Sequence, residues 1–223
     1  MKFSLSLLAL LISVCWVHAD IVIVENITGG TQSGEMTVKV SGDKVRADMP
    51  SQVSTITDAS TGDITTLMNA QKVYMLIPAA TGKAMMARFN EMMQANGAAM
   101  GTPSPLTASG KTDKINGYNA KEYTFSNGML KASYWMSTDF PNAQKVADAL
   151  AKVRKGSLAD MTKAFAPDLT SVPGVPIRTE IEINGTKTTT ELVSATEQQI
   201  DPSEFQVPAA YTEMQVPAMP QAH

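Results

Sequence analysis

The sequence predicts an α+β fold built on an antiparallel sheet of about eleven strands, together with about three helices. Short runs of alternating apolar and polar residues predict the strands, and Asn-Gly and Gly-Asp pairs between them predict the turns. Segments with apolar residues at helical spacing predict the helices. Removing a predicted leader of 19 residues from the 223 leaves 204, which suits one such domain or two small ones. No linker divides the chain.

The first 19 residues have the features of a secretory signal peptide. Lys2 precedes an apolar run from Leu5 to Val17, and a small residue, Ala19, stands before the first acidic residue. We therefore expect cleavage after Ala19, a periplasmic or secreted protein, and no transmembrane segment after cleavage, because the run is too short to span a bilayer. The alternative, a lipoprotein signal at residues 12–15, would place a bulky valine where such signals carry a small residue.

Cleavage removes the side chains on which several classes of chemistry depend. The only cysteine, Cys15, and one of two histidines, His18, lie in the leader, which leaves His223 at the C-terminus. The mature chain therefore excludes disulfides, Cys/His zinc sites, and Cys/His or Ser/His/Asp catalysis. We expect no enzyme activity, no metal and no cofactor.

The charge of the mature chain argues against two classes of partner. Without Lys2 the chain has 17 basic and 21 acidic residues, a net charge of −4, and its basic residues do not cluster. Nucleic acids and anionic membrane surfaces attract basic patches. We therefore expect neither as the main partner.

Six strands are predicted before the first helix. They lie at residues 20–26, 35–40, 44–49, 53–58, 63–68 and 72–77. The third is typical of the set: Val45, Ala47 and Met49 point one way, while Lys44 and Arg46 point the other. One side of this part of the sheet is therefore predicted to face water.

A methionine-rich helix follows the sixth strand. Pro78 ends the strand and Gly82 leads into the predicted helix. On a helical wheel its apolar residues, Met85, Met86, Phe89, Met92 and Met93, occupy an arc of roughly 120°. This face has to be buried against the sheet, a bound apolar ligand, or both.

The remaining elements form the second half of the domain. Strands are predicted at residues 107–115, 121–125, 130–137, 177–183 and 187–195, with hairpin turns at Asn116-Gly117, Asn127-Gly128 and Asn184-Gly185. A second helix starts near Asp139 and Pro141, with Val146, Leu150 and Val153 on its apolar side, and a third occupies residues 157–165. We expect one domain at 20–211 and a flexible tail at 212–223.

Methionine is the most unusual component, at 15 residues of 223. Clustered thioethers could bind Cu(I), although exported copper sites usually recruit histidine as well. Flexible methionines also suit surfaces that accept varied apolar partners, and they pack ordinary cores. Carboxylates are predicted singly on the outer faces of strands, where no pair is spaced for acid and base catalysis.

Four segments resemble a known family. They are Gly-Asp-Lys-Val-Arg at 42–46, Ala-Gln-Lys-Val-Tyr at 70–74, Tyr-Trp-Met-Ser at 134–137 and the closing Asp-Pro-Ser-Glu-Phe-x-Val-Pro-x-x-Tyr at 201–211. Together they resemble the DUF4412 family of uncharacterised exported bacterial proteins. More distantly, the element pattern resembles the LolA/LolB-like periplasmic lipoprotein carriers, in which an incomplete barrel curls around an apolar groove and helices form its lid.

The resemblance implies a curved sheet, forming an incomplete barrel, with the helices packed on its concave side. By analogy, an acyl chain would lie between the sheet and the methionine-rich helix. The ligand-binding residues implied in this way are Met68, Met75, Met85, Met86, Phe89, Met92, Met93, Tyr134 and Met136. No catalytic residue is implied.

Three functions remain open from the sequence. The first is a carrier that binds a lipid, an acylated protein or another apolar ligand. The second is a cell-envelope module with a filled core and a protein partner at an exposed strand edge. The third is a hydrolase that uses neither histidine nor cysteine, which has the least support because no catalytic carboxylate pair is visible.

Overall fold

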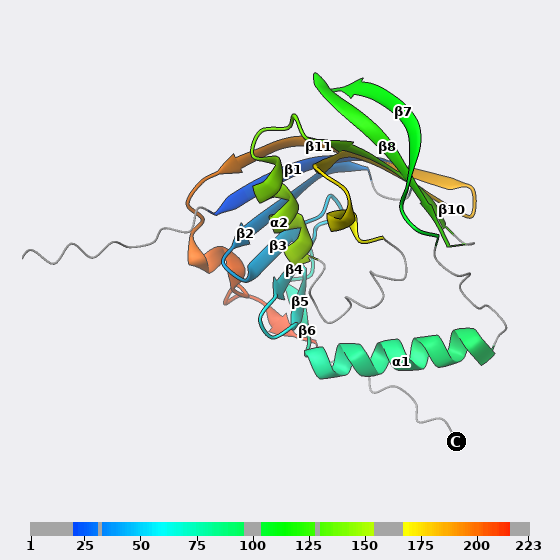
Figure 1. Ribbon diagram of the computed structural model, residues 1–223. Helices are drawn as coiled ribbons and strands as arrows, with labels where there is room; N and C mark the ends of the chain where they lie inside the picture. The colour runs from blue at the N-terminus through cyan, green and yellow to red at the C-terminus, as the bar shows by residue number, and fades with distance from the viewer. Residues whose placement is uncertain (1–19, 31–32, 96–103, 128–129, 154–166, 215–223) are drawn as a thin grey trace, which may run out of the picture.

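Among the residues that the structure describes, the fold is an α+β arrangement of one large sheet and two α-helices (Figure 1). The computed structural model describes residues 20–30, 33–95, 104–127, 130–153 and 167–214. Within these ranges the sheet has 12 strands in the order β12-β6-β5-β4-β3-β2-β1-β11-β10-β9-β8-β7, and it does not close on itself. All neighbours are antiparallel except β12 and β6, which are parallel.

The first half of the chain is a meander in which each strand pairs with the next. Its strands are β1 (Ile21–Gly29), β2 (Gly34–Ser41), β3 (Lys44–Asp48), β4 (Val53–Asp58), β5 (Ile64–Met68) and β6 (Val73–Ile77). Helix α1 (Ala79–Ala95) follows β6 directly. The six strands confirm the six predicted here, with small changes at their ends.

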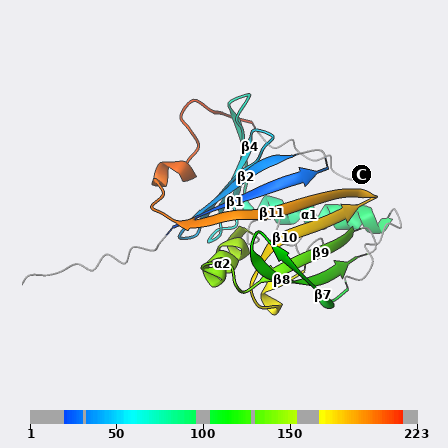
Figure 2. The ribbon, with the colours of Figure 1, turned by 90° about the horizontal axis from the view of Figure 1, so that it is seen from above.

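The second half of the chain forms the remaining strands of the sheet, and its last long strand pairs with β1. Its strands are β7 (Thr107–Ile115), β8 (Tyr118–Ser126), β9 (Leu130–Ser137), β10 (Val175–Ile183) and β11 (Thr186–Glu197). Helix α2 (Ala143–Val153) and the short 3-10 helix η1 (Leu169–Ser171) lie between β9 and β10 in the chain, and η2 (Pro202–Phe205) and β12 (Thr212–Glu213) follow β11. Figure 2 shows β11 beside β1 in the middle of the sheet, where their pairing joins the two halves.

Two of the predicted Asn-Gly turns are confirmed by their backbone angles. Asn116 and Gly117 have φ values of 50° and 89°, and Asn184 and Gly185 have 50° and 79°. Positive φ at both central residues is what a tight hairpin requires, because that geometry matches the twist of the flanking strands.

The main core lies where α2 packs on the sheet. Val146 and Ala149 of α2 are buried among strand residues that include Ile23, Val38 and Leu192. Beside it a second buried cluster is formed by β8 and β9: Phe125, Leu130, Ala132, Tyr134 and Met136. Leu130, Ala132, Tyr134 and Met136 therefore share one buried face of β9, as their alternation predicts.

Several predicted details of the helices are wrong or lie outside the described residues. Helix α1 begins at Ala79, so Gly82 lies inside it. The reason is a contact from outside the helix: Asp63, 16 residues earlier in the chain, accepts a hydrogen bond from the Ala79 backbone N–H at 2.9 Å and so caps the helix immediately after Pro78. The predicted third helix at 157–165 lies outside the described residues.

The predicted faces need correction at two apolar residues. Val153 of α2 is 37% exposed, and Ile183 of β10 is 43% exposed. Both stand at the end of their element, where the core no longer covers the predicted apolar face.

The last described residues pair with the β6 strand. Thr212 and Met214 donate backbone hydrogen bonds to the carbonyls of Lys72 and Tyr74, at 3.0 and 2.7 Å. Across the part of the chain that the structure describes, no helix is both long and apolar enough to cross a membrane.

Candidate functional site

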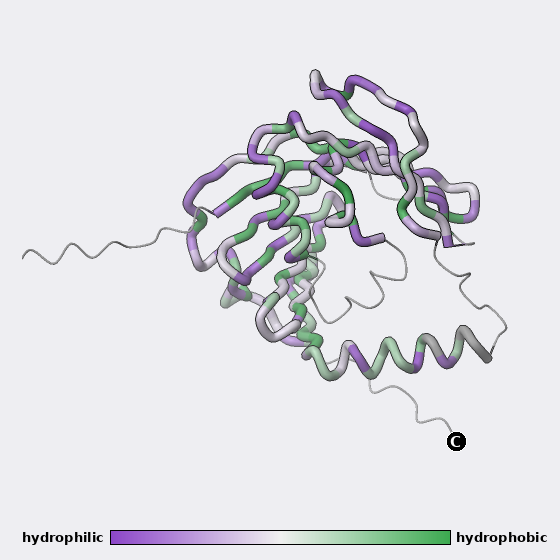
Figure 3. Tube along the Cα trace, in the orientation of Figure 1, coloured by the Kyte–Doolittle hydropathy of each residue, from purple (hydrophilic) through white to green (hydrophobic). Residues whose placement is uncertain are grey.

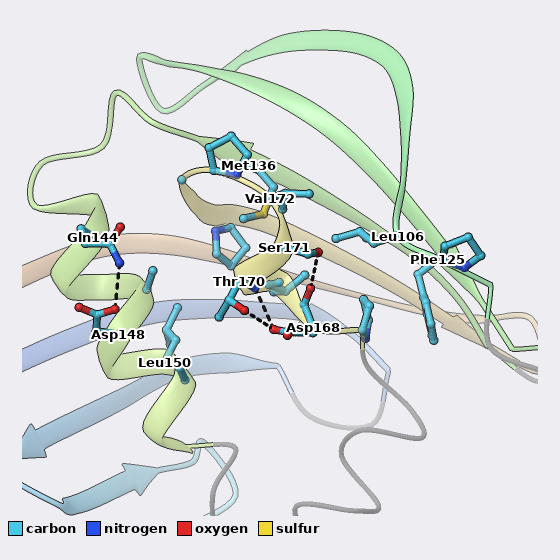
Figure 4. Close-up of a pocket in the computed structure, with 18 of the residues that line it drawn as sticks. Leu106, Phe125, Met136, Gln144, Asp148, Leu150, Asp168, Thr170, Ser171 and Val172 are labelled. Atoms are coloured by element: carbon cyan, nitrogen blue, oxygen red, sulfur yellow. Dashed lines mark hydrogen bonds between the residues drawn. The ribbon is translucent and has the colours of Figure 1, made fainter.

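The main cavity lies between α2, the segment around η1, and strands β8 and β9 (Figure 4). Its volume is about 880 Å³, and we call it the apolar cavity. Helix α2 contributes Ala147 and Leu150, and the sheet contributes Phe125 and Met136. Volumes of several hundred Å³ are typical of sites that enclose a small organic ligand.

The walls of the apolar cavity carry few hydrogen-bond donors. Its apolar side chains are Leu106, Phe125, Met136, Leu150, Leu169 and Val172, and it also has four prolines, Pro105, Pro167, Pro173 and Pro176. Proline has no backbone N–H, so the η1 segment offers the cavity fewer donors than an ordinary loop would. This composition favours an apolar occupant.

Most polar side chains at the cavity are hydrogen-bonded to other residues of its lining. Asp168 caps η1 by accepting hydrogen bonds from the Thr170 backbone N–H at 3.0 Å and from its hydroxyl at 2.7 Å. The Gln144 amide donates to Asp148 Oδ1 at 2.9 Å (Figure 4). Hydrogen-bonded polar groups cost less to cover with an apolar ligand than unpaired groups do.

The predicted ligand-binding residues fall in three places. Met136 lines the apolar cavity, and Tyr134 is buried beside it on β9. Met68 and Met75 lie on the β5 and β6 hairpin, and the other five lie on α1. The structure therefore brings Met136 and Tyr134 together in one buried cluster, although of these two only Met136 lines the cavity, and it leaves the helix methionines outside that cluster.

Helix α1 is distinct from both core clusters. Neither cluster contains a residue of α1, and Figure 1 shows the helix extending away from the end of β6. Met86 is buried, Met85 and Phe89 are half-buried, and Met92 is 54% exposed. The side chain of Met93 lies outside the described residues.

Sequence reasoning missed most of the walls of the cavity. Leu106, Leu169 and Val172 come from irregular segments, where no periodic pattern marks a buried side chain. Phe125 of β8 could have been predicted. It pairs with Ala132 of β9, so its side chain projects to the same side of the sheet as the buried face of β9.

Two carboxylates are buried, against the expectation that carboxylates stand on outer faces. Glu25 of β1 is 9% exposed and lies opposite Met36 on β2 and Leu192 on β11. Burial raises the pKa of Glu25 to about 7. No described residue forms a hydrogen bond or ion pair with its carboxylate.

Glu122 of β8 is buried with partners and has the opposite electrostatic behaviour. Its carboxylate accepts a hydrogen bond from Ser109 at 2.7 Å and lies 3.2 Å from the Lys111 ammonium. Desolvation raises its pKa, but the bonds to Ser109, Ser133 and Lys111 outweigh that effect and lower it overall. Among the described residues no three His, Cys, Asp or Glu side chains form a metal-binding group.

Solved structures resemble the chain only weakly. PNGF-II, solved in two crystal forms, aligns at 12% identity and a TM-score of 0.42, covering 89% of this chain and 32% of PNGF-II in the first form. The chain thus spans about a third of PNGF-II. The lipoprotein LppX of Mycobacterium tuberculosis aligns at 12% identity and a TM-score of 0.39, covering 82% of this chain and 88% of LppX. These TM-scores are too low to carry an argument.

The sequence comparisons are decisive about the family. No curated protein matches the chain. The family model described as a domain of unknown function, DUF4412, matches residues 22–211, which is nearly the whole described domain. This confirms the resemblance seen in the four sequence motifs, and the chain belongs to the DUF4412 family.

Proposed function

We propose that this protein is a non-enzymatic binding protein that takes an apolar ligand, a lipid or an acyl chain, into the apolar cavity. The observation that carries the proposal is the cavity itself, about 880 Å³ with walls of leucine, valine, phenylalanine, methionine and proline. A filled-core module would have close packing at this place instead. We place the function in the periplasm or outside the cell, on the predicted cleavage after Ala19.

The methionine-rich helix is a second part of the proposal. Met85 and Phe89 are half-buried and Met92 is largely exposed, so α1 offers an apolar surface that is not absorbed into either core cluster. We propose that this surface, with Met68, Met75 and Met86, contributes to binding. Flexible thioethers suit apolar ligands of varied shape.

The test begins with the mature protein purified from its own envelope. Native mass spectrometry followed by solvent extraction identifies any ligand that is released. Protein stripped of lipid is then titrated with cis-parinaric acid, whose fluorescence rises in an apolar site. We expect saturable binding to the wild-type protein.

Substitutions locate the binding site. Leu169→Asp places a carboxylate in the cavity wall, and we expect affinity to fall by about ten-fold or more, because an unpaired charge beside an acyl chain is costly. Val193→Asp is the matched control, since Val193 is 57% exposed on β11. Met85→Glu tests α1 separately. Absence of probe binding to the wild type, or equal binding by all variants that keep their melting temperature, would refute the proposal.

The envelope module is the second candidate, and one feature of β7 bears on it. This strand is at the edge of the sheet and is exposed along its length up to Ile115. However, an irregularity in pairing between Ala108 and Thr112, together with Lys111 and Lys114, is the kind of feature that discourages a strand from pairing with another chain. The carrier is therefore the better supported function.

A further inference from the structure

A second hollow adjoins the apolar cavity. Its volume is about 470 Å³, and it is lined by residues of β7, β8 and β9 together with Thr138 and Asp139. Met136 and Pro173 line both hollows, so they form a wall that the two share. Because Lys114 and Lys121 line the second hollow, we call it the lysine pocket.

Strand register places the two lysines on the same face as the apolar cavity. Lys121 on β8 pairs directly with Met136 on β9, and with Thr112 on β7. Directly paired residues project to one side of a sheet, with Cβ atoms about 5 Å apart. Lys114 pairs with Asn119, two residues from Lys121, so the two lysines are diagonal neighbours at about 7 Å. One small anion can contact both ammonium groups at that spacing.

Neither lysine has an acidic partner among the described residues, a property that they share on the sheet with Lys131 of β9. The ammonium groups of Lys39, Lys44, Lys111 and Lys187 each lie within 4.0 Å of a carboxylate. Among the described residues the ammonium groups of Lys114 and Lys121 have no such partner and no hydrogen bond. Figure 3 shows the hydrophilic character of the β7 and β8 hairpin on which they stand.

The lysine pocket is also lined by two carboxylates, each of which has a partner other than the two lysines. Asp113 lies 3.7 Å from the Arg178 guanidinium, and Asp139 accepts a hydrogen bond from the Asn119 amide at 2.7 Å. The Arg178 charge offsets that of Asp113, whereas Asp139 keeps its charge beside the neutral Asn119 amide, so two lysines face one carboxylate that has no cationic partner. The described lining of the apolar cavity, in contrast, has two carboxylates, Asp148 and Asp168, and no lysine or arginine. An anionic group is favoured in the lysine pocket and disfavoured in the apolar cavity.

We propose that the ligand is an anionic amphiphile, whose apolar chain occupies the apolar cavity and whose carboxylate or phosphate head is bound by Lys114 and Lys121. In this arrangement the ligand lies along Met136 and Pro173, which line both hollows, and the thioether of Met136 contacts the chain next to the head. This assignment rests on the proposed function and adds the chemical class of the ligand.

The test compares ligands that share a chain and differ in the head. Mature protein stripped of lipid is loaded with cis-parinaric acid at about pH 8, where a carboxylate is ionised. The competitors are oleic acid, oleoyl lysophosphatidic acid and neutral monooleoylglycerol, so carboxylate, phosphate and uncharged heads are measured separately. The test variant carries both Lys114→Gln and Lys121→Gln. The control variant carries Lys72→Gln alone, at an exposed lysine in a turn.

We expect the anionic competitors to displace the probe better than monooleoylglycerol in wild-type protein, and this preference to weaken with added salt. In the double variant the affinity for anionic competitors should fall roughly three- to ten-fold, while that for the neutral competitor stays constant. Lys72→Gln should match the wild type. The anionic competitor with the higher affinity, oleic acid or oleoyl lysophosphatidic acid, identifies the preferred head as carboxylate or phosphate.

Two outcomes would overturn the assignment, and they can be told apart. Equal affinity for charged and neutral heads, or a double variant that matches the wild type, refutes the lysine pocket and leaves the carrier proposal standing. Failure of every probe and competitor to bind refutes both. Binding by either variant is interpreted only if its circular dichroism spectrum and thermal unfolding match those of the wild type.

Discussion

Glu25 should make the stability of this protein fall as the pH rises through neutrality. The carboxyl is buried opposite Met36 and Leu192, and burial raises its pKa from an ordinary value of 4.5 to about 7. Below the lower value both folded and unfolded chains hold the proton. Between the two values the folded chain keeps the proton and the unfolded chain releases it, so the free energy of unfolding decreases as the pH increases.

The size of the effect follows from the same two values. A pKa unit corresponds to about 1.4 kcal/mol, so the difference between 4.5 and about 7 amounts to a loss on the order of 3 kcal/mol between acidic and mildly alkaline solution. Glu25→Gln removes the titrating group while keeping a similar shape. The free-energy difference between wild type and variant should therefore vary with pH by about this amount, whatever constant cost the buried amide adds.

The assay is urea unfolding from about pH 4 to pH 8.5, followed by the fluorescence of Trp135. Trp135 is the single tryptophan outside the predicted leader. Glu35→Gln, an exposed carboxyl on the neighbouring strand, is the matched control and should show no comparable pH-dependent difference. The quantity to plot is the unfolding free energy of the wild type minus that of Glu25→Gln, which should fall as the pH rises. A plot that is flat, or that rises with pH, would refute the inference that Glu25 is buried without a partner.

Two further substitutions test the packing around the apolar cavity by the same unfolding assay. Gly174 has φ of +95°, and an added Cβ would clash with the backbone carbonyl oxygen of Ser137, so Gly174→Ala should cost more than about 1 kcal/mol. Gly185→Ala, also at positive φ but with open space around it, should cost less. Val146→Ala should cost roughly 1–3 kcal/mol because Val146 is fully buried on α2. Val193→Ala, at an exposed site, should cost close to nothing, and equal losses within either pair would contradict the packing described.

Local signals in the sequence were sufficient to predict β1 to β11, but not the two-residue β12. The predicted strands 53–58, 107–115 and 130–137 match β4, β7 and β9 at both ends. Each is bounded by turn residues or proline, and β4 and β9 also contain side chains that suit a pleated, partly buried surface, whereas β7 is exposed up to Ile115. Both properties are encoded within a few residues, so no knowledge of the tertiary structure was needed.

The arrangement of the strands and the cavity had no such local signal. The pairing of β1 with β11 depends on contacts between distant parts of the chain. The inward side chain of Glu25 follows from that same pairing, and its polar character argued for an outer face. The predicted site centred on α1 because its methionines form a periodic pattern, whereas the leucines and prolines near η1 do not.

The pairing of β1 with β11 also limits the order in which the molecule can fold. Strands β1 to β6 are joined by short connections and can form from local hairpins. The free edge of β1, with Ile21 and Val22 at its start, stays unpaired until β11 has been made, which is nearly the entire length of the domain. Contacts of such sequence separation form slowly, and an unpaired apolar edge is prone to aggregation. A chain cut short before Thr186 therefore keeps most of its strands but loses the one that covers this edge.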